Sequence, residues 1–220
     1  MSAVADPRAV PRLAFAVDGA AVQELAAVPT LRLGLRVERM GGGPVRSIAL
    51  QAQVRIAAPR RGYDDATQER LAELFGTPEQ WGRTLHSLLW THASVMVPPF
   101  DDATTVALLL PCTYDFEVAA AKYLHGLRDG DVPLELMFSG TVFSRDPEGR
   151  LQVTQIASDC EASFALPVGV WRAAMERAFG ESTWLRLDRE AFDRLYAYRA
   201  SRALGTWEAT LDTLLREAGA

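Results

Sequence analysis

The chain has 220 residues, of which 49% are hydrophobic and 23% are charged, and its formal net charge is −5. This composition is typical of globular proteins and excludes disorder as the default state. The negative charge argues against nucleic acid or an anionic membrane as the main partner. No run approaches the ~18 consecutive apolar residues of a membrane-spanning helix, and the first residues lack the features of a secretory signal. We therefore expect a cytoplasmic protein that does not insert into membranes.

Alternating apolar residues predict strands in the first three quarters of the chain. Every second residue is apolar in segments 30–38 and 48–56, which is the period of a half-buried strand. A glycine-rich loop at 41–44 separates these two runs and predicts that they form an antiparallel hairpin. Further strands are predicted at 13–17, 88–97, 104–110 and 133–143, and 151–166 is predicted to be one long strand or a bent pair. The total is about seven strands.

Helix signals gather in two other places. The segment 57–84 interrupts the strands, and Asp65 is a candidate N-cap within it, so we predict a helical insertion there. After Pro167 the apolar period changes from 2 to 3.6 residues. Asp188 and Thr206 are in position to cap two further helices. The C-terminal region therefore predicts three helices.

This order of elements, strands first and helices last, predicts an α+β fold rather than alternating βαβ units. We expect an antiparallel, immunoglobulin-like β-sandwich of about seven strands over residues 13–166, with the helical insertion at 57–84. The helices of residues 167–220 carry apolar stripes too large to leave in water. They must pack on the sandwich, on one another or on a partner, and we expect the sandwich to be the surface that they cover.

Four side chains could contribute to a zinc or nickel site, namely His86, His92, Cys112 and Cys160. The two histidines are six residues apart, or ~20 Å along a straight strand, so one metal ion cannot bind both unless the strand bends. The sequence contains no C-x-x-C, H-x-x-x-H or H-E-x-x-H pattern. We therefore predict no metal centre and no cofactor. A metal-handling protein in which these residues converge remains the alternative.

Catalytic patterns are also missing from the sequence. The G-x-S-x-G nucleophile pattern is absent. The three glycines at 41–43 lack the lysine and the following helix of a phosphate-binding loop. We predict no catalytic residue and no enzymatic activity. A second alternative is an enzyme or small-ligand carrier with a pocket between the sandwich and the helices.

Aromatic residues are dense in the C-terminal helices. Three of the five tryptophans, Trp171, Trp184 and Trp207, lie there together with Tyr196 and Arg199. Packing on the sandwich is one explanation for this density. The other is an exposed patch that binds a protein, because Trp, Tyr and Arg contribute most to interface energetics. We take these five residues as interaction candidates and expect a protein partner or a second copy of the chain.

Four segments resemble an uncharacterised bacterial family found near gene clusters of high-affinity nickel–iron hydrogenases. They are 110–117 (LPCTYDFE), 122–134 (KYLHGLRDGDVPL), 138–143 (FSGTVF) and 166–171 (LPVGVW). The resemblance covers most of the chain from about residue 13, and the family has no established functional residues to transfer. It implies an accessory or assembly role, with a hydrogenase subunit as a possible partner. Our hypothesis from the sequence is therefore a non-catalytic cytoplasmic accessory protein.

Overall fold

The computed structural model of the chain describes residues 11–113, 115, 118–146, 148–180 and 186–219. The chain divides into two compact units, Met1–Gly180 and Glu181–Ala220. We describe each unit by itself.

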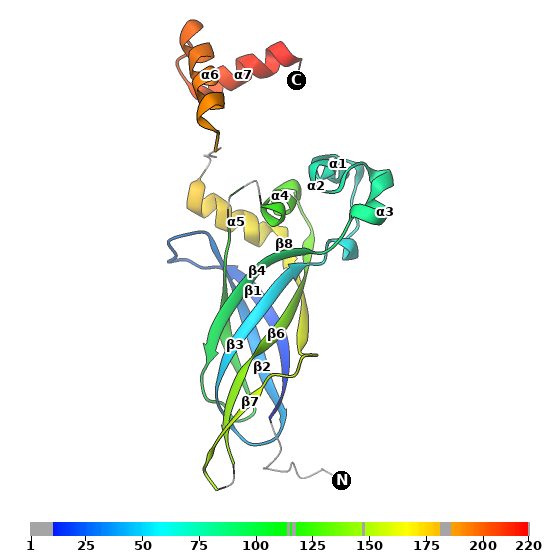
Figure 1. Ribbon diagram of the computed structural model, residues 1–220, viewed down its shortest axis with the longest axis vertical. Coiled ribbons are helices and arrows are strands. Elements are labelled where there is room, and N and C mark those ends of the chain that lie inside the picture. Colours follow the sequence, from blue (N-terminus) through cyan, green and yellow to red (C-terminus); the bar gives the residue numbers. More distant parts are fainter. Residues whose placement is uncertain (1–10, 114, 116–117, 147, 181–185, 220) are drawn as a thin grey trace. The chain divides into compact units, whose positions relative to one another are not determined.

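The first unit is built on two antiparallel sheets (Figure 1). One sheet has the strand order β1-β2-β5, formed by β1 (Arg12–Val22), β2 (Thr30–Gly41) and β5 (Ala103–Pro111). The other has the order β4-β3-β6-β7, formed by β4 (Leu88–Val97), β3 (Val45–Ile56), β6 (Asp131–Arg145) and β7 (Leu151–Gln155), and β8 (Glu161–Pro167) also pairs with β6. With the helices described below, these sheets confirm the predicted α+β sandwich.

The predicted hairpin of the two alternating runs is wrong. β2 pairs with β1 and β5, whereas β3 pairs with β4 and β6, so the loop at 41–44 crosses from one sheet to the other. The apolar residues of both strands point inward, and Leu33, Leu35, Leu50 and Val54 are at most 1% exposed. Alternation of apolar residues predicts which face of a strand is buried, but it does not identify the strand's partner.

The first predicted strand, at 13–17, is also too short. β1 continues through Asp18 to Val22, with a register shift between Val17 and Gly19 where it pairs with β2. Such a shift accommodates an extra residue without ending the strand. Asp18 and Gly19 therefore mark an irregularity within β1, and the strand does not end there.

Strand β6 organises the larger sheet. It pairs with β3 along one edge, while β8 and β7 share the other edge in succession. Gly140 lies where the chain passes from one partner to the other, and its φ of +138° is rarely adopted by other residues. A Cβ atom at this position would lie 2.1 Å from the carbonyl oxygen of Ala49. A glycine is therefore required for β3 and β6 to approach each other here.

The segment between β3 and β4 contains the predicted helical insertion. Its short helices are η1 (Ala58–Arg60), α1 (Asp65–Arg70), α2 (Ala72–Phe75), η2 (Pro78–Gln80) and α3 (Trp81–Thr84). The N-cap of α1 is Asp64, whose side chain accepts a hydrogen bond from the Thr67 amide at 2.7 Å, and not the predicted Asp65. Leu71 and Phe75 are at most 1% exposed. The insertion therefore contributes to the core of the first unit.

Two longer helices complete the first unit. They are α4 (Ala119–Gly126) and α5 (Val168–Phe179), and Figure 1 shows both at the same end of the sheets as the insertion. Helix α5 contacts β1, β2 and β8, and its residues Val168, Ala174 and Met175 are buried. The first of the three predicted C-terminal helices is thus part of the first unit.

The second unit contains α6 (Arg189–Ser201) and α7 (Trp207–Ala218). The predicted N-caps are confirmed. The Asp188 side chain accepts a hydrogen bond from the Ala191 amide, and the Thr206 side chain accepts one from the Ala209 amide. Thr210 is the only buried residue in these two helices. Packing of α6 and α7 on the sandwich stays a prediction. No described helix is long and apolar enough to cross a membrane.

Candidate functional site

Two of the five predicted interaction residues do not lie on a described surface. Trp171 is only 5% exposed and belongs to the core of the first unit, so its prediction as a surface residue is wrong. The reason is that α5 lies against β1, β2 and β8, which cover its apolar stripe. Trp184 lies outside the described residues.

The other three predicted residues lie together in the second unit, joined by Phe192. The ring of Trp207 is 5.6 Å from the ring of Phe192 and 6.3 Å from the ring of Tyr196, between centroids. The guanidinium of Arg199 lies 4.6 Å from the centroid of the Trp207 ring, in cation–π contact. We call these four residues the aromatic–arginine surface. Phe192 and Tyr196 are 43% and 56% exposed, so the rings are available to another molecule.

Arg199 also fixes the turn between the two helices. Its Nε donates to the carbonyl oxygen of Leu204 at 3.1 Å, and its Nη2 donates to that of Gly205 at 2.7 Å. These bonds satisfy carbonyl groups just beyond the end of α6. Because the same guanidinium stacks on Trp207 at the start of α7, one side chain sets the relation between the two helices.

A second set of polar contacts joins the C-terminal end of α6 to the last turn of α7. Tyr198 Oη donates to Glu217 at 3.0 Å, and Arg202 forms an ion pair with the same carboxylate. The Arg202 guanidinium also lies 4.6 Å from the Tyr198 ring centroid. The contacts between α6 and α7 are therefore largely polar and aromatic.

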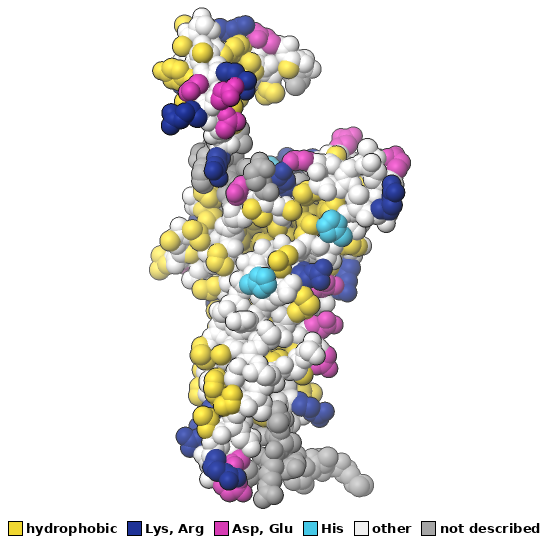
Figure 2. All heavy atoms as spheres, viewed as in Figure 1, with side chains coloured by type: hydrophobic (Ala, Val, Ile, Leu, Met, Phe, Trp, Pro, Cys, Tyr) yellow, Lys and Arg dark blue, Asp and Glu magenta, His cyan; other side chains and the backbone are white. Residues whose placement is uncertain are grey.

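Helix α7 carries further exposed apolar side chains. Leu211 and Leu215 are 47% and 53% exposed, and their spacing of four places them on one helix face with Trp207. Figure 2 shows hydrophobic side chains at the surface of the second unit, beside charged side chains of both signs. The second unit therefore presents a mixed apolar and charged surface.

The structure separates the two cysteines that were weak metal candidates. Cys112 lies near the start of β2, because the preceding residue, Pro111, pairs with Thr30. The Cys160 thiol lies near the other end of β2, because it contacts the carbonyl of Leu13, which pairs with Arg39. From Thr30 to Arg39 the chain of β2 advances ~3.3 Å per residue, so the two thiols lie roughly 30 Å apart along this strand. Burial raises the pKa of the Cys112 thiol to about 12, which disfavours the thiolate that metals bind.

The two candidate histidines do not converge with either cysteine. His86 precedes β4 and its ring contacts Phe75, while His92 is exposed within β4, opposite Gln53 of β3. Within the part of the chain that the structure describes, no group of three His, Cys, Asp or Glu side chains is placed to hold a metal ion. The structure thus brings no metal-binding set together from the predicted residues.

A basic hollow at the helical end of the first unit was not predicted. It has a volume of about 320 Å³ and lies between the α1–α2 segment and α4. Its charged lining residues are Arg70, Glu73, Lys122, His125 and Arg128. Lys122 and Glu73 form an ion pair. Since the net charge of the chain is negative, this excess of cationic groups is a local feature.

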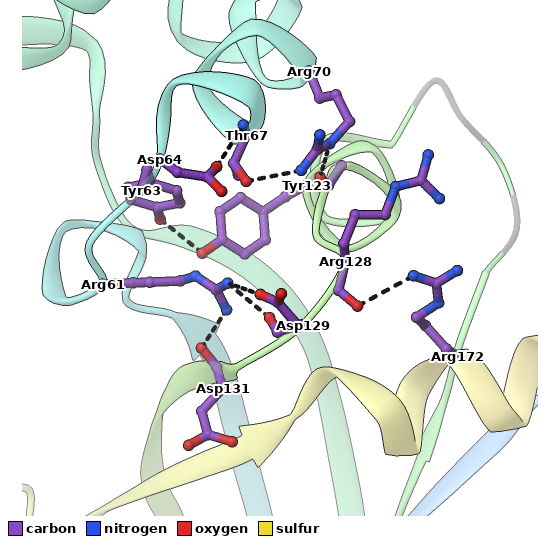
Figure 3. Close-up of polar contacts among 11 residues, drawn as sticks. Arg61, Tyr63, Asp64, Thr67, Arg70, Tyr123, Arg128, Asp129, Asp131 and Arg172 are labelled. Carbon is purple, nitrogen blue, oxygen red and sulfur yellow. Dashed lines mark hydrogen bonds and ion pairs between the residues drawn. The ribbon is translucent and has the colours of Figure 1, made fainter.

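The wall of this basic hollow depends on a close approach of two helical segments. Arg70 Nη2 donates to Thr67 Oγ1 at 2.8 Å (Figure 3). Arg70 Nε donates to the carbonyl of Gly126 at 2.7 Å. A Cβ atom at Gly126 would lie 2.7 Å from Leu71 Cδ2. The absence of a side chain at Gly126 therefore lets the end of α4 reach α1.

Beneath the basic hollow, two tyrosines join the insertion to α4. Tyr63 Oη donates to the carbonyl of Ala58 at 2.8 Å, so Tyr123 must donate the 2.8 Å bond between the two hydroxyl groups. Burial raises the pKa of both phenols. Nearby, Arg61 donates to the carbonyls of Asp129 and Asp131, each at 2.7 Å (Figure 3). These contacts hold the segment after α4 in place.

Sequence reasoning missed this basic hollow because its residues come from distant positions. Arg70 lies in the insertion, while Lys122 and Arg128 lie in or after α4. No motif or periodicity links them, and arginine is abundant throughout the chain. The one local signal is the density of basic residues between 122 and 128, which includes Lys122, His125 and Arg128.

Comparisons with known proteins identify a family and weak structural likenesses. A family model described as "Family of unknown function (DUF6084)" matches residues 10–220. A search of curated proteins found no match. A CARDB domain from Pyrococcus furiosus, solved in complex with di-metal ions, matches with 13% identity and a TM-score of 0.28, covering 71% of this chain and 91% of that one.

Beta-glucosidase 3B from Thermotoga neapolitana, solved in complex with alpha-D-glucose, is another similar structure. It matches with 14% identity and a TM-score of 0.24, and the match covers 70% of this chain and 17% of the enzyme. The same enzyme in complex with glycerol gives the same values. At these TM-scores the likenesses carry no argument about the activity of this chain.

Proposed function

Because the chain belongs to the DUF6084 family of unknown function, we propose its role from its own surfaces: it is a non-catalytic accessory protein that binds a partner protein. The observation that carries this proposal is the exposure of apolar and aromatic side chains on α6 and α7. The binding surface that we propose consists of the aromatic–arginine surface together with Leu211 and Leu215 of α7.

The physical argument begins with the size of the second unit. Helices α6 and α7 have 13 and 12 residues, and isolated helices of this length are marginally stable in water. Units this small seldom build a sufficient apolar core alone. Here Thr210 is the only buried residue of the two helices. A partner that covers the exposed side chains would supply the apolar burial that the unit lacks.

The composition of this surface also suits a protein interface. Tyr, Trp and Arg are the residue types that contribute most to binding energy, and here Tyr196, Trp207 and Arg199 lie within one cluster. The arginine is already held by two backbone carbonyls, so little side-chain entropy is lost on binding. A complementary partner would offer an apolar groove with carbonyl or carboxylate acceptors at its rim.

We propose a subunit or assembly factor of a nickel–iron hydrogenase as the partner. This choice rests on the resemblance of four segments to a family found near such gene clusters. We propose the cytoplasm as the compartment in which the two proteins meet.

The test is co-purification of the full chain from its native host, with mass spectrometry of the eluate for hydrogenase subunits. We expect these subunits with the wild-type chain and a loss of at least ten-fold with Leu211→Asp. The matched control is Leu151→Asp, since Leu151 of β7 is 65% exposed in the first unit. This control should retain the partner.

Two results would overturn the proposal. One is the absence of any hydrogenase subunit from the wild-type eluate, and the other is equal recovery with Leu211→Asp. Sedimentation of the purified chain measures its oligomeric state and tests a third outcome, the formation of a homodimer. A stable homodimer that Leu211→Asp dissociates would make the partner a second copy and would refute the hydrogenase assignment.

A further inference from the structure

We infer that the basic hollow between α1, α2 and α4 binds a phosphate group carried by a small molecule. This inference concerns the first unit and does not depend on the proposed protein partner. The basic hollow, at about 320 Å³, falls at the lower end of the range of small-ligand sites. It is therefore large enough for a ligand that extends beyond one phosphate group.

The charge of the lining selects an anion. Arg70, Lys122 and Arg128 are cationic, and Glu73 is the only acidic side chain among the lining residues that the structure describes. Glu73 is engaged by Lys122 in an ion pair. Among the lining residues that the structure describes, Arg70 and Arg128 then leave two positive charges in excess. A phosphate monoester carries about −1.5 to −2 at pH 7, so it matches this excess better than a single carboxylate does.

The two arginines differ in how they are held. Arg70 is fixed by its bonds to Gly126 and Thr67, which use Nε and one Nη2 hydrogen. A guanidinium has five N–H donors, so three remain for a ligand. Arg70 is thus pre-oriented, which lowers the entropy lost on binding.

Arg128 is anchored through its backbone. Its carbonyl accepts a hydrogen bond from Arg172 Nη1 at 3.2 Å, and Figure 3 shows its side chain extending away from that bond toward α4. The structure gives no hydrogen bond or ion pair between the Arg128 guanidinium and another described side chain. Its donors remain available for charge-assisted hydrogen bonds to phosphate oxygens.

His125 reports the electrostatic state of the basic hollow. Burial, and then the charges of Arg128 and Arg172, lower the pKa of this histidine. The other charged groups around the basic hollow are Arg70, Lys122 and Glu73. A bound phosphate would offset the cationic neighbours and raise the pKa of His125. This rise is a readout of binding that requires no knowledge of the natural ligand.

The test uses the full chain with three probes, namely pyrophosphate, adenosine monophosphate and acetate at equal ionic strength. Calorimetry should detect binding of the two phosphates, and NMR titration should show a raised His125 pKa in their presence. Acetate should bind at least ten-fold more weakly. Tighter binding of adenosine monophosphate than of pyrophosphate would indicate that the natural ligand is an organic phosphate ester. Tighter binding of pyrophosphate would indicate an inorganic polyphosphate.

Two substitutions with the same charge change test whether phosphate binding depends on the basic hollow or on surface charge in general. Arg128→Gln should weaken phosphate binding by about ten-fold or more, because it removes a charge-assisted contact. The matched control is Arg145→Gln, which makes the same charge change at the exposed end of β6 and should leave binding within two-fold. Circular dichroism checks that both variants fold. Absence of phosphate binding at millimolar concentration, or an equal loss in both variants, would overturn the inference.

Discussion

The two units of this chain use their apolar residues in opposite ways. In the first unit the inward residues of both sheets, together with Phe75, Tyr123 and Trp171, form one continuous core. In the second unit the aromatic and leucine side chains remain partly exposed, and Arg199 and Arg202 make polar contacts that join α6 to the turn and to α7. The comparison teaches that similar amphipathic patterns can build a self-sufficient core in one region and an open surface in another.

The largest expected contrast comes from the same substitution in the two units. Leu33→Ala removes a fully buried side chain of β2 and should lower the free energy of unfolding by about 2–5 kcal/mol. Leu211→Ala removes a side chain that is 47% exposed, and it should cost about 0.5 kcal/mol. Amide hydrogen exchange within each unit measures both effects. Equal costs would break the comparison.

Backbone geometry within the first unit gives the next effect. Gly140→Ala should destabilise the protein by about 2–3 kcal/mol, because it adds strain at a positive φ and a collision with the Ala49 carbonyl. Gly149 also has a positive φ, +83°, but no atom lies within 4 Å of its Cβ position. Gly149→Ala should therefore cost only about 1 kcal/mol. Urea denaturation distinguishes the two, and similar midpoints would show that β3 and β6 can separate at little cost.

The polar contacts of Arg199 in the second unit predict a smaller effect on the free energy of unfolding. Arg199→Gln removes the stacking on Trp207 and weakens the bonds to two carbonyls, so we expect a loss of about 1–2 kcal/mol. Arg194→Gln removes only an exposed ion pair with Glu190 and should cost about 0.3 kcal/mol. Hydrogen exchange of the α7 amides is the measurement. Unchanged exchange in Arg199→Gln would mean that apolar contacts, and not Arg199, hold α6 and α7 together.

The smallest effect concerns pH. The pKa of His125 is lower in the folded chain than its ordinary value near 6.5, so the unfolded state binds the proton more readily. Stability should fall as pH decreases through that ordinary value toward the folded pKa. His125→Gln should reduce this dependence between pH 7.5 and 5.5. Denaturation midpoints of the wild-type chain and of His125→Gln at both pH values test the prediction, and an unchanged pH dependence in the variant would contradict it.

Local sequence signals were most reliable where one residue and its near neighbours decide the structure. The caps at Asp188 and Thr206 depend on contacts three residues apart, and both are present. Asp64 and Asp65 are adjacent and equally suited to the cap, so the sequence could not choose between them. The structure chooses Asp64 because its side chain reaches the Thr67 amide.

Signals failed where the answer depends on distant parts of the chain. Trp171 lies in an amphipathic helix whose apolar stripe is covered by strands β1, β2 and β8, and the pattern within α5 does not specify these distant strands. Strand pairing failed for the same reason, since the alternation in β2 and β3 does not specify a partner. The basic hollow is lined by Arg70 and Arg128 together, and they come from segments that are joined by the bond between Arg70 and the Gly126 carbonyl.

The insertion leaves and re-enters the larger sheet at adjoining points, because Ile56 pairs directly with Leu88. A segment whose two ends already meet can change in length or content without altering the register of its flanking strands, since closing a longer loop costs little more. The insertion also supplies one wall of the basic hollow. Changes in the sequence or length of the insertion would therefore alter which ligand the basic hollow prefers, and the sheets of the sandwich would keep their structure.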